Sequence, residues 1–311
     1  MTTSTALDVA VIGAVGVDTV VYPPDSWSWG GQSEGTLAEI QHVVAHGGGY
    51  AARGYAALGY RTAFVGHVGQ DADGALVRAT LAADGVDLSA CVTSGRTAHS
   101  VNVMSTDGSR RNFYDPRLVG VQPPSESDVA GLLSRTRMVH VNIPDWARTL
   151  IEPARRRGVV VAVDVQDTPG AHDAYRLDFV RGADLLFASA AQLDDPESYA
   201  RWAMTAGPAS LVVMGLGPDG CLVVQRDGPA ERVAVVELSP DPVTGVAPPV
   251  VDTNGAGDSL AVGVASALVI DRLPLDAAVR RGLLCARWCC SLRGSSDGLL
   301  SASMLRDGQS R

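Results

Sequence analysis

The stretch VVDTNGAGDSLAVGVASALVI, residues 250–270, has the clearest chemical potential in the chain. Its residues Gly255, Ala256 and Gly257 leave the backbone bare just before an apolar segment, for which we expect a helix over residues 256–270. Free backbone N–H groups at the start of a helix, together with the helix dipole, can cradle a phosphate oxygen. The pattern therefore predicts a small anion site.

Asp258 follows this bare backbone and would lie beside the bound anion. One interpretation makes Asp258 a general base, which takes the proton from an alcohol as that alcohol attacks a phosphoryl group. The other interpretation is structural: Asp258 caps the helix, and the glycines form a tight turn.

The elements that would position these residues alternate between strands and helices. Apolar strands are expected at residues 8–14, 138–141, 159–163, 184–187 and 211–214, and a further strand is expected to end at 250–251. Helical patterns lie between them. This alternation predicts an α/β fold with a doubly wound, mostly parallel sheet and helices on both faces. Ligands then bind beyond the carboxyl ends of the strands.

Two segments, residues 16–46 and 97–115, do not fit that sheet. The end of the first favours one or two short strands, and the second alternates apolar and polar residues around Asp107-Gly108, which indicates a hairpin. We expect a single domain over residues 1–311, in which these two segments form a small β-sheet lid over the main sheet.

The composition argues against several classes of protein. A net charge of −9 and a pI near 5.1 do not suit a general nucleic-acid surface, which needs a basic stripe. No apolar stretch is long enough to cross a bilayer, and the N-terminus lacks the basic region of a signal peptide. The five cysteines show no metal-ligand spacing and indicate reduced thiols. We expect a cytoplasmic protein that binds neither nucleic acid nor membrane.

A second glycine-rich stretch, GGGYAARGYAALGYRTAFVGHVGQDADG, spans residues 47–74. With DTNGAGD at residues 252–258, it makes the chain resemble the PfkB family of carbohydrate kinases, which includes ribokinase, fructokinase and adenosine kinase. The family's C-terminal motif D-T-x-G-A-G-D is matched at every position, and its N-terminal motif is matched in glycines and spacing. The resemblance covers nearly the whole chain, including the expected lid.

On the phosphate side, the resemblance implies that Asp258 is the catalytic base and that residues 255–257 form the hole for the transferred phosphate. Asp252 would help to bind a monovalent cation, usually K⁺, and Ser295 lies in the loop that would close that cation site. Thr253, in the same motif, is assigned to the bound cofactor.

On the nucleotide and substrate sides, VVMGLGPDGCLVV resembles the strand and turn in which Gly217 and Gly220 let the chain pass close to ATP. A simple hairpin turn explains those two glycines almost as well. By the resemblance, Asp18 would accept hydrogen bonds from substrate hydroxyls, and Gly48 would give a backbone contact; a solvated turn is the alternative for Asp18. Asn142, directly after an expected strand, could reach the pocket or cap the next helix.

The chain departs from the family pattern at two places. Tyr50 stands where the first motif normally has an Asn that binds the sugar, which favours a substrate with fewer hydroxyls or with a flat group that stacks on the ring. Ser189 and Gln192 replace the N-x-x-E motif, which is tied to Mg²⁺ and phosphate. We therefore expect altered Mg²⁺ support, with Asp194 or Asp195 as candidates.

Two further expectations concern the lid. Val20, Val43 and Val44 suggest an apolar lid face, and with the resemblance they favour a homodimer formed through the lids. Arg110-Arg111 is interpreted as a solvated hairpin end in preference to a grip on a substrate phosphate.

Together these patterns predict an ATP-dependent kinase that uses Mg²⁺, and K⁺ by the resemblance, to phosphorylate a primary hydroxyl of a sugar or sugar derivative. A nucleoside kinase on the same fold is the nearest alternative, supported by Tyr50. A non-catalytic sugar or nucleotide sensor is the alternative from another class.

Overall fold

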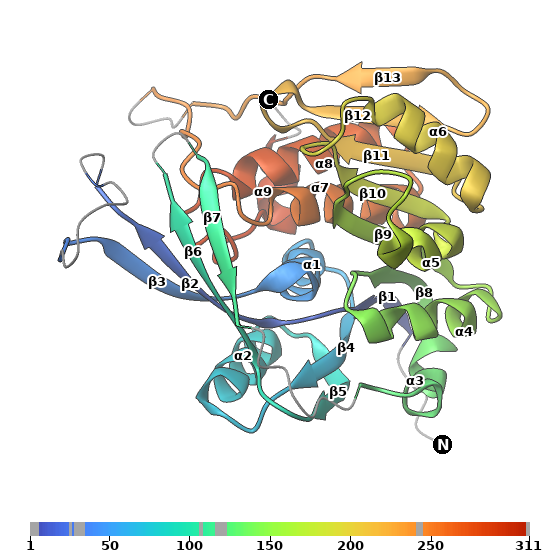
Figure 1. The fold of residues 1–311 in the computed structure, drawn as a ribbon, viewed down its shortest axis with the longest axis horizontal. Helices are drawn as coiled ribbons and strands as arrows, with labels where there is room; N and C mark the ends of the chain where they lie inside the picture. The colour runs from blue at the N-terminus through green and yellow to red at the C-terminus, as the bar shows by residue number, and fades with distance from the viewer. Residues whose placement is uncertain are drawn as a thin grey trace.

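The computed structural model describes residues 6–24, 27, 35–105, 108–115, 123–240 and 245–308 (Figure 1). Its strands are β1 Leu7–Ile12, β2 Gly16–Tyr22, β3 Glu39–Ala45, β4 Thr62–Val68, β5 Asp87–Thr93, β6 Ala98–Met104, β7 Arg110–Tyr114, β8 Thr136–Val141, β9 Val160–Asp167, β10 Leu185–Ser189, β11 Leu211–Gly215, β12 Cys221–Gln225 and β13 Ala230–Val233. Its α-helices are α1 His46–Ala57, α2 Ala72–Ala83, α3 Glu126–Leu133, α4 Ile151–Arg155, α5 Ala174–Gly182, α6 Pro196–Ala206, α7 Ala256–Ala265, α8 Leu275–Cys289 and α9 Ala302–Gly308.

The large sheet has the strand order β13-β12-β11-β10-β9-β8-β1-β4-β5. In this sheet, neighbouring strands pair in parallel along the row β5, β4, β1, β8, β9, β10 and β11. Strands β12 and β13 add an antiparallel edge. The chain starts at the centre of the sheet with β1 and builds outward in both directions, which confirms the predicted doubly wound α/β fold. The carboxyl ends of the parallel strands therefore meet along one edge.

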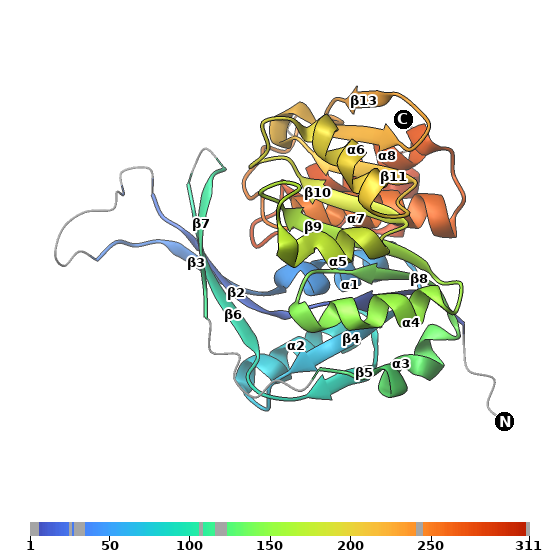
Figure 2. The ribbon, with the colours of Figure 1, turned by 45° about the vertical axis from the view of Figure 1, so that its right-hand side comes forward.

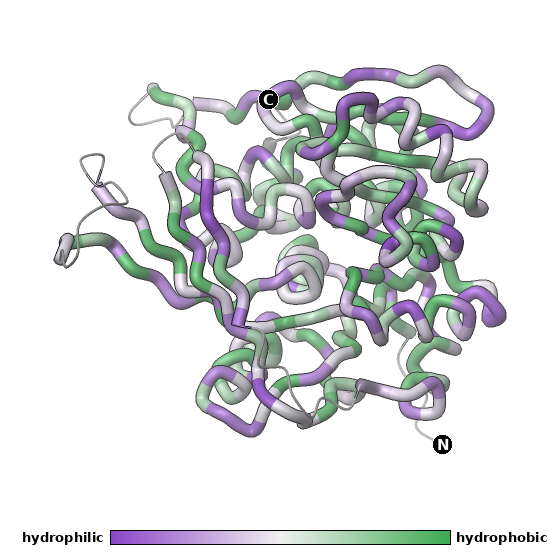
Figure 3. The backbone as a smooth tube through the Cα atoms, in the orientation of Figure 1, coloured by the Kyte–Doolittle hydropathy of each residue, from purple (hydrophilic) through white to green (hydrophobic). Residues whose placement is uncertain are grey.

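Both faces of the large sheet are covered by helices. Helices α3 to α6 pack on one face through residues such as Leu133 and Phe179, and α1, α2, α7 and α8 pack on the other through residues such as Leu81 and Leu283. Because the central strands face helices on both sides, all six residues of β1 are buried. In Figure 3, which colours the backbone by hydropathy, the central strands are mostly in the hydrophobic colours.

A second sheet of order β3-β2-β6-β7 stands beside the large one (Figure 2). Its strands lie within the two predicted lid segments, and β6 and β7 form the expected antiparallel hairpin, of which Asp107 lies outside the described residues. The single domain over residues 1–311 stays a prediction. We call this four-stranded element the small sheet.

The register of the small sheet sorts its side chains onto two faces. Asp18 pairs with Ser100, which pairs with Tyr114, so these three side chains share one face. The next residues along the strands, among them Thr19 and Phe113, belong to the opposite face. We call the face of Asp18 the inner face, because its polar residues line the cavity described below.

Three local predictions need correction. No strand is present at residues 250–251; the backbone N–H groups of Val251 and Asp252 instead bond the carbonyl of Cys290, at the end of α8. The helix expected over residues 256–270 is α-helical to Ala265 and continues as a π-helical turn, Ser266–Ile270. The first strand ends two residues earlier than expected.

The apolar lid face was assigned to the wrong side chains. Val20, Val43 and Val44 are at most 3% exposed within the chain itself, so they cannot form a surface for a second subunit. Among the described residues of the small sheet, the exposed large hydrophobic side chains are Ile40 at 57%, Phe113 at 52% and Tyr114 at 67%, of which Ile40 and Phe113 lie on the face opposite Asp18.

Among the described residues, no helix combines the length and apolar character needed to span a membrane.

Candidate active site

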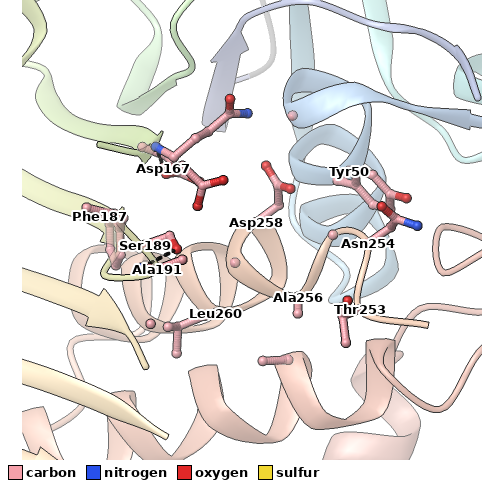
Figure 4. A pocket seen from close by; sticks show the side chains of 18 of the residues that line it. Tyr50, Asp167, Phe187, Ser189, Ala191, Thr253, Asn254, Ala256, Asp258 and Leu260 are labelled. Atoms are coloured by element: carbon pink, nitrogen blue, oxygen red, sulfur yellow. Dashed lines mark hydrogen bonds between the residues drawn. The ribbon is translucent and has the colours of Figure 1, made fainter. Parts of the chain in front are cut away.

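A cavity of about 1240 Å³ lies at the carboxyl ends of the parallel strands, between the large sheet and the inner face of the small sheet. Figure 4 shows the Asp258 carboxylate pointing into it, between Asp167 on one side and Tyr50 and Asn254 on the other. Most of the predicted site residues line this one cavity: Asp18, Gly48, Tyr50, Asn142, Gly217, Gly220, Thr253, Gly255, Ala256, Gly257 and Asp258. Asp252 and Ser295 are buried behind it.

The predicted anion hole lies at the entry into α7. Gly255 precedes the helix with φ +71°, a left-handed backbone that favours glycine. A Cβ atom on Gly255 would lie 2.4 Å from Cε1 of Tyr50, whereas a Cβ on Gly257 would meet no atom within 4 Å. Gly255 is therefore required by conformation and packing. Gly257 instead keeps the cavity open at the helix N-terminus, where an anion is stabilised.

Asp258, in the first turn of α7, has an electrostatic environment suited to a base. Its Oδ1 is buried without a hydrogen-bond partner among the described residues. Burial raises the pKa of Asp258 well above its ordinary value, and the negative charge of Asp164 raises it further. Asp164, within β9, is 4% exposed, and its pKa is raised to about 6, chiefly by burial. Two carboxyl groups thus face one cavity with a strengthened affinity for protons.

Asp18, on β2, is held by its neighbours on the inner face. Its Oδ1 accepts a hydrogen bond of 2.6 Å from the hydroxyl of Ser100, and its Oδ2 accepts one of 2.9 Å from Nδ2 of Asn102. His46 Nε2 lies 3.2 Å from the same Oδ1. Burial alone would raise the pKa of Asp18, but these contacts outweigh burial and lower it. Asp18 is therefore a fixed anionic acceptor in the cavity wall.

Asn142 follows β8, and its side chain lies between two glycines, Gly13 and Gly47. A Cβ on Gly13 would lie 2.7 Å from Asn142 Oδ1, and one on Gly47 would lie 2.8 Å from Asn142 Nδ2. Asn142 is 2% exposed, and neither side-chain atom has a hydrogen-bond partner among the described residues. The amide is therefore available to a ligand. Gly48 is equally constrained, since its Cβ would lie 2.6 Å from the carbonyl oxygen of Ala14.

Tyr50 reaches the cavity wall, but its hydroxyl is occupied. The hydroxyl forms a hydrogen bond of 2.7 Å with Ser295 Oγ, and the ring packs against Gly255. The side chain is 5% exposed. Tyr50 thus packs behind the predicted anion hole, an arrangement that the sequence did not indicate.

Asp252 is the residue predicted to help bind a monovalent cation. Its buried carboxylate accepts hydrogen bonds from the Tyr22 hydroxyl at 2.5 Å and the Asn254 backbone N–H at 2.8 Å, while burial raises its pKa. The carbonyl oxygens of Asn254 and Ser295 both lie 3.3 Å from Cys289 Sγ, so they converge. Carboxylate and carbonyl oxygens are the ligand types that a hard cation prefers, and these two carbonyls converge on the Cys289 thiol. The backbone oxygen of Ser295 is the candidate ligand, since its hydroxyl bonds Tyr50.

The turn between β11 and β12 lines the other end of the cavity. Gly217 and Gly220 have φ +62° and +89°. A Cβ on Gly217 would meet open space, whereas one on Gly220 would lie 2.0 Å from the carbonyl oxygen of Val233. The turn is a hairpin, as the simpler interpretation held, and it also borders the cavity, as a nucleotide site requires.

Arg110 is an exposed residue at the start of β7, as the hairpin-end interpretation held, but it also has a partner in the cavity wall. It lies on the inner face and lines the cavity, and its Nη1 donates a hydrogen bond of 2.8 Å to Thr253 Oγ1. Thr253 in turn donates to the carbonyl of Gly108 at 3.0 Å. Arg111 belongs to the opposite face by register.

The residues expected to replace the glutamate of the N-x-x-E motif, Gln192, Asp194 and Asp195, do not line the cavity. Ser189 lines the cavity, but Gln192 is exposed and outside it. Asp195 caps α6 by accepting hydrogen bonds from Ser198, and Asp194 is exposed. The cavity carboxylates missed in the sequence are Asp164 and Asp167, which lie within the carboxyl-terminal half of β9 in the stretch VDVQD.

A helix N-terminus and the half-buried Asp258 face a polar sheet across a cavity at the carboxyl ends of parallel strands, the arrangement of a phosphotransferase with a ribokinase-like fold. The model of the pfkB family of carbohydrate kinases matches residues 6–302, and the chain belongs to this family. The enzyme is accordingly a carbohydrate kinase with an alcohol group as phosphate acceptor.

Several known proteins are similar to this chain over most of its length. The acarbose 7(IV)-phosphotransferase of an Actinoplanes species is 30% identical over 305 residues, covering 96% of this chain and 97% of that protein. An ATP-dependent ribose-1-phosphate kinase of Halopiger xanaduensis is 29% identical over 85% of this chain and 86% of its own. A microbiome-derived acarbose kinase of solved structure superposes with a TM-score of 0.85 at 31% identity, covering 99% and 100%. Ribokinase of Arabidopsis thaliana, solved with ribose and ATP, shares the fold with a TM-score of 0.77 at 21% identity, covering 97% and 99%.

Proposed function

We propose that this carbohydrate kinase transfers the γ-phosphate of ATP to a primary hydroxyl of a sugar or sugar derivative, with Asp258 as the general base. The observation that carries the proposal is the adjacency of Asp258 to the open helix N-terminus at Gly257. An acceptor hydroxyl next to Asp258 would lose its proton as it attacks a phosphorus atom held by the amides of residues 255–257. The raised pKa of Asp258 strengthens it as a proton acceptor.

The acceptor would bind on the side of the cavity formed by Asp18 and Asn142, and the nucleotide on the side of Gly217 and Gly220. Magnesium would supply charge neutralisation for the phosphates, and Asp164 or Asp167 would hold it there with the nucleotide. K⁺ would be held by Asp252 with nearby carbonyl oxygens, where it would stabilise the loop that leads into the anion hole.

No observation favours the nucleoside alternative over a sugar. Its support was a Tyr50 ring available for stacking, but that ring packs on Gly255. The sensor alternative does not explain why Asp258, with a buried Oδ1 and a raised pKa, lies beside the proposed anion site.

We also propose a homodimer formed through the small sheets, but with different contact residues from those expected in the sequence. The outer face of the small sheet is the face opposite Asp18. It carries Ile40 and Phe113, both more than half exposed, on the strands at the two edges of the sheet. Such side chains suit contact with a second copy. Sedimentation of the wild type and of Ile40→Asp tests this: a dimer that the substitution dissociates supports the proposal.

The test of function is ADP release from ATP–Mg²⁺ with K⁺, across acarbose, D-ribose, D-fructose, ribose 1-phosphate and adenosine. Asp258→Asn is the matched control, because it keeps the shape and removes the base. We expect a sugar or sugar derivative to stimulate turnover, and the variant to lose about a thousandfold in kcat. Turnover by the variant at the wild-type rate would contradict the role of Asp258, and turnover with adenosine alone would favour the nucleoside alternative.

A further inference from the structure

His46 begins α1 with a backbone conformation that histidine rarely adopts. Its φ is +64°, and it is one of four non-glycine residues with positive φ among the described residues. This left-handed conformation is unfavourable for a residue with a Cβ and persists where the surrounding structure imposes it. Its side chain lines the cavity beside Asp18. Strained residues of this kind concentrate at functional sites.

The position of His46 determines how much of Asp18 a substrate can use. A carboxylate has about four acceptor positions, two on each oxygen. On Oδ1 of Asp18, the hydroxyl of Ser100 takes one position and His46 Nε2, at 3.2 Å, takes the space of the other. On Oδ2, Asn102 takes one position and leaves one. A pair of adjacent hydroxyls therefore cannot bind with one hydroxyl on each oxygen.

His46 also brings a donor of its own. A ring nitrogen this close to a carboxylate oxygen is assigned an N–H, because two lone pairs would repel each other. Yet Nε2 is buried and makes no well-aligned hydrogen bond with the described residues. A buried donor without an aligned acceptor is costly and is commonly satisfied by a ligand. The wall beside Asp18 thus offers one free carboxylate position and one N–H donor.

We propose that His46 is a specificity-determining residue, which restricts Asp18 to a single substrate hydroxyl and pairs with a neighbouring acceptor oxygen. The favoured substrate class is a sugar whose oxygen next to that hydroxyl is substituted, as in an ether or a glycoside, because such an oxygen accepts but cannot donate. A free sugar with adjacent hydroxyls is disfavoured. This inference rests on the proposed function, since it takes Asp18 as part of the acceptor site.

The test measures binding, so it does not depend on turnover. D-Ribose, a free sugar with adjacent hydroxyls, is titrated calorimetrically into the wild type, His46→Gly and His46→Asn, each with Mg²⁺ and a non-hydrolysable ATP analogue. Glycine and asparagine both tolerate the left-handed backbone. His42→Ala is the matched control: His42 pairs with Thr19 and so belongs to the outer face.

We expect ribose to bind about tenfold more tightly to His46→Gly, and in the same direction to His46→Asn, because charge-assisted bonds on both oxygens of Asp18 become available. His42→Ala stays within twofold of the wild type. Equal or weaker binding to both His46 variants, or no binding to any of the proteins, overturns the inference.

Two further measurements separate the possible failures. The melting temperature of His46→Gly is expected to equal or exceed that of the wild type, so a gain in affinity is not a by-product of unfolding. If the wild type releases no ADP with any acceptor, the proposed function fails while the ribose titration still decides the role of His46.

Discussion

Arg110 of the small sheet donates a hydrogen bond of 2.8 Å to the hydroxyl of Thr253, three residues before the helix that carries the candidate base. The same hydroxyl donates to the backbone of Gly108. The hairpin of the small sheet is thereby joined to the loop that enters the anion hole. This contact brings a guanidinium group to the part of the cavity where the transferred phosphate is proposed to bind.

Replacement of Arg110 by alanine is expected to lower kcat by about tenfold to a hundredfold, because a positive charge next to the developing phosphate charge is lost. Arg111→Ala is the matched control, since Arg111 faces the other way by register. Steady-state kinetics of the two variants decide the matter. Equal effects of the two substitutions would remove the role given to Arg110.

The two glycines of the anion hole are expected to fail in different ways. Gly255→Ala places a Cβ against the Tyr50 ring at φ +71°, so it should cost about 1–2 kcal/mol of stability from the backbone alone, as well as activity. The added Cβ of Gly257→Ala has no described atom within 4 Å, so the melting temperature should stay unchanged. The same Cβ should lower kcat by about tenfold or more, because it fills the proposed anion site. Thermal unfolding and ADP release separate the two cases. Full activity in Gly257→Ala would contradict an anion site there.

The acid side of the pH profile should depend on Asp164. A base must be unprotonated, so activity rises as pH passes the pKa of Asp258, which burial and then the charge of Asp164 raise. Asp164→Asn removes that charge and lowers the pKa of Asp258. The acid limb of kcat/KM, which reports the free enzyme, should therefore move to lower pH. An unmoved limb would show that the two carboxyl groups do not interact.

The same pair predicts a stability effect. The folded state favours the protonated form of a carboxyl group whose pKa it raises. The protein therefore becomes less stable as the pH rises through that raised pKa and the group ionises. Asp258→Asn should therefore melt at a higher temperature than the wild type at pH 8, and the difference should shrink as the pH falls toward 4. A lower melting temperature at pH 8 would contradict this.

Removal of the Tyr50 hydroxyl is expected to affect stability more than substrate binding. Tyr50→Phe loses the buried hydrogen bond to Ser295 and should cost about 1 kcal/mol. The KM for the sugar should stay within twofold, because that hydroxyl is already occupied. A large rise in KM with an unchanged melting temperature would return Tyr50 to direct contact with the substrate.

Magnesium support should follow the cavity carboxylates. Asp167→Asn is expected to raise the Mg²⁺ concentration for half-maximal activity several-fold, because Asp167 lines the cavity. Gln192→Glu should leave it unchanged, since Gln192 is exposed outside the cavity. A Mg²⁺ titration of both variants checks the assignment, and the reverse pattern would contradict it.

The parts of the site that could be predicted are those written contiguously in the chain. The anion hole and Asp258 lie within four residues, so their spacing alone specifies a helix entry. The neighbours of Asp18 could not be found in this way, because Ser100 and Asn102 reach it only through the pairing register of β2 and β6. For the same reason Arg110 and Arg111 look alike in sequence, although one faces the cavity. Tyr50 was assigned by position in a motif, which does not specify the partner of its hydroxyl.

The strand order also has a consequence for how the enzyme comes into being. The chain begins at the centre of the large sheet, where β1 pairs with β4 and with the more distant β8. Such non-local pairing slows folding. The sugar-side residues of the small sheet are synthesised within the first third of the chain, whereas α7, which carries Asp258, comes only after both sheets are complete. A growing chain therefore completes both sheets before it gains the helix that carries the candidate base.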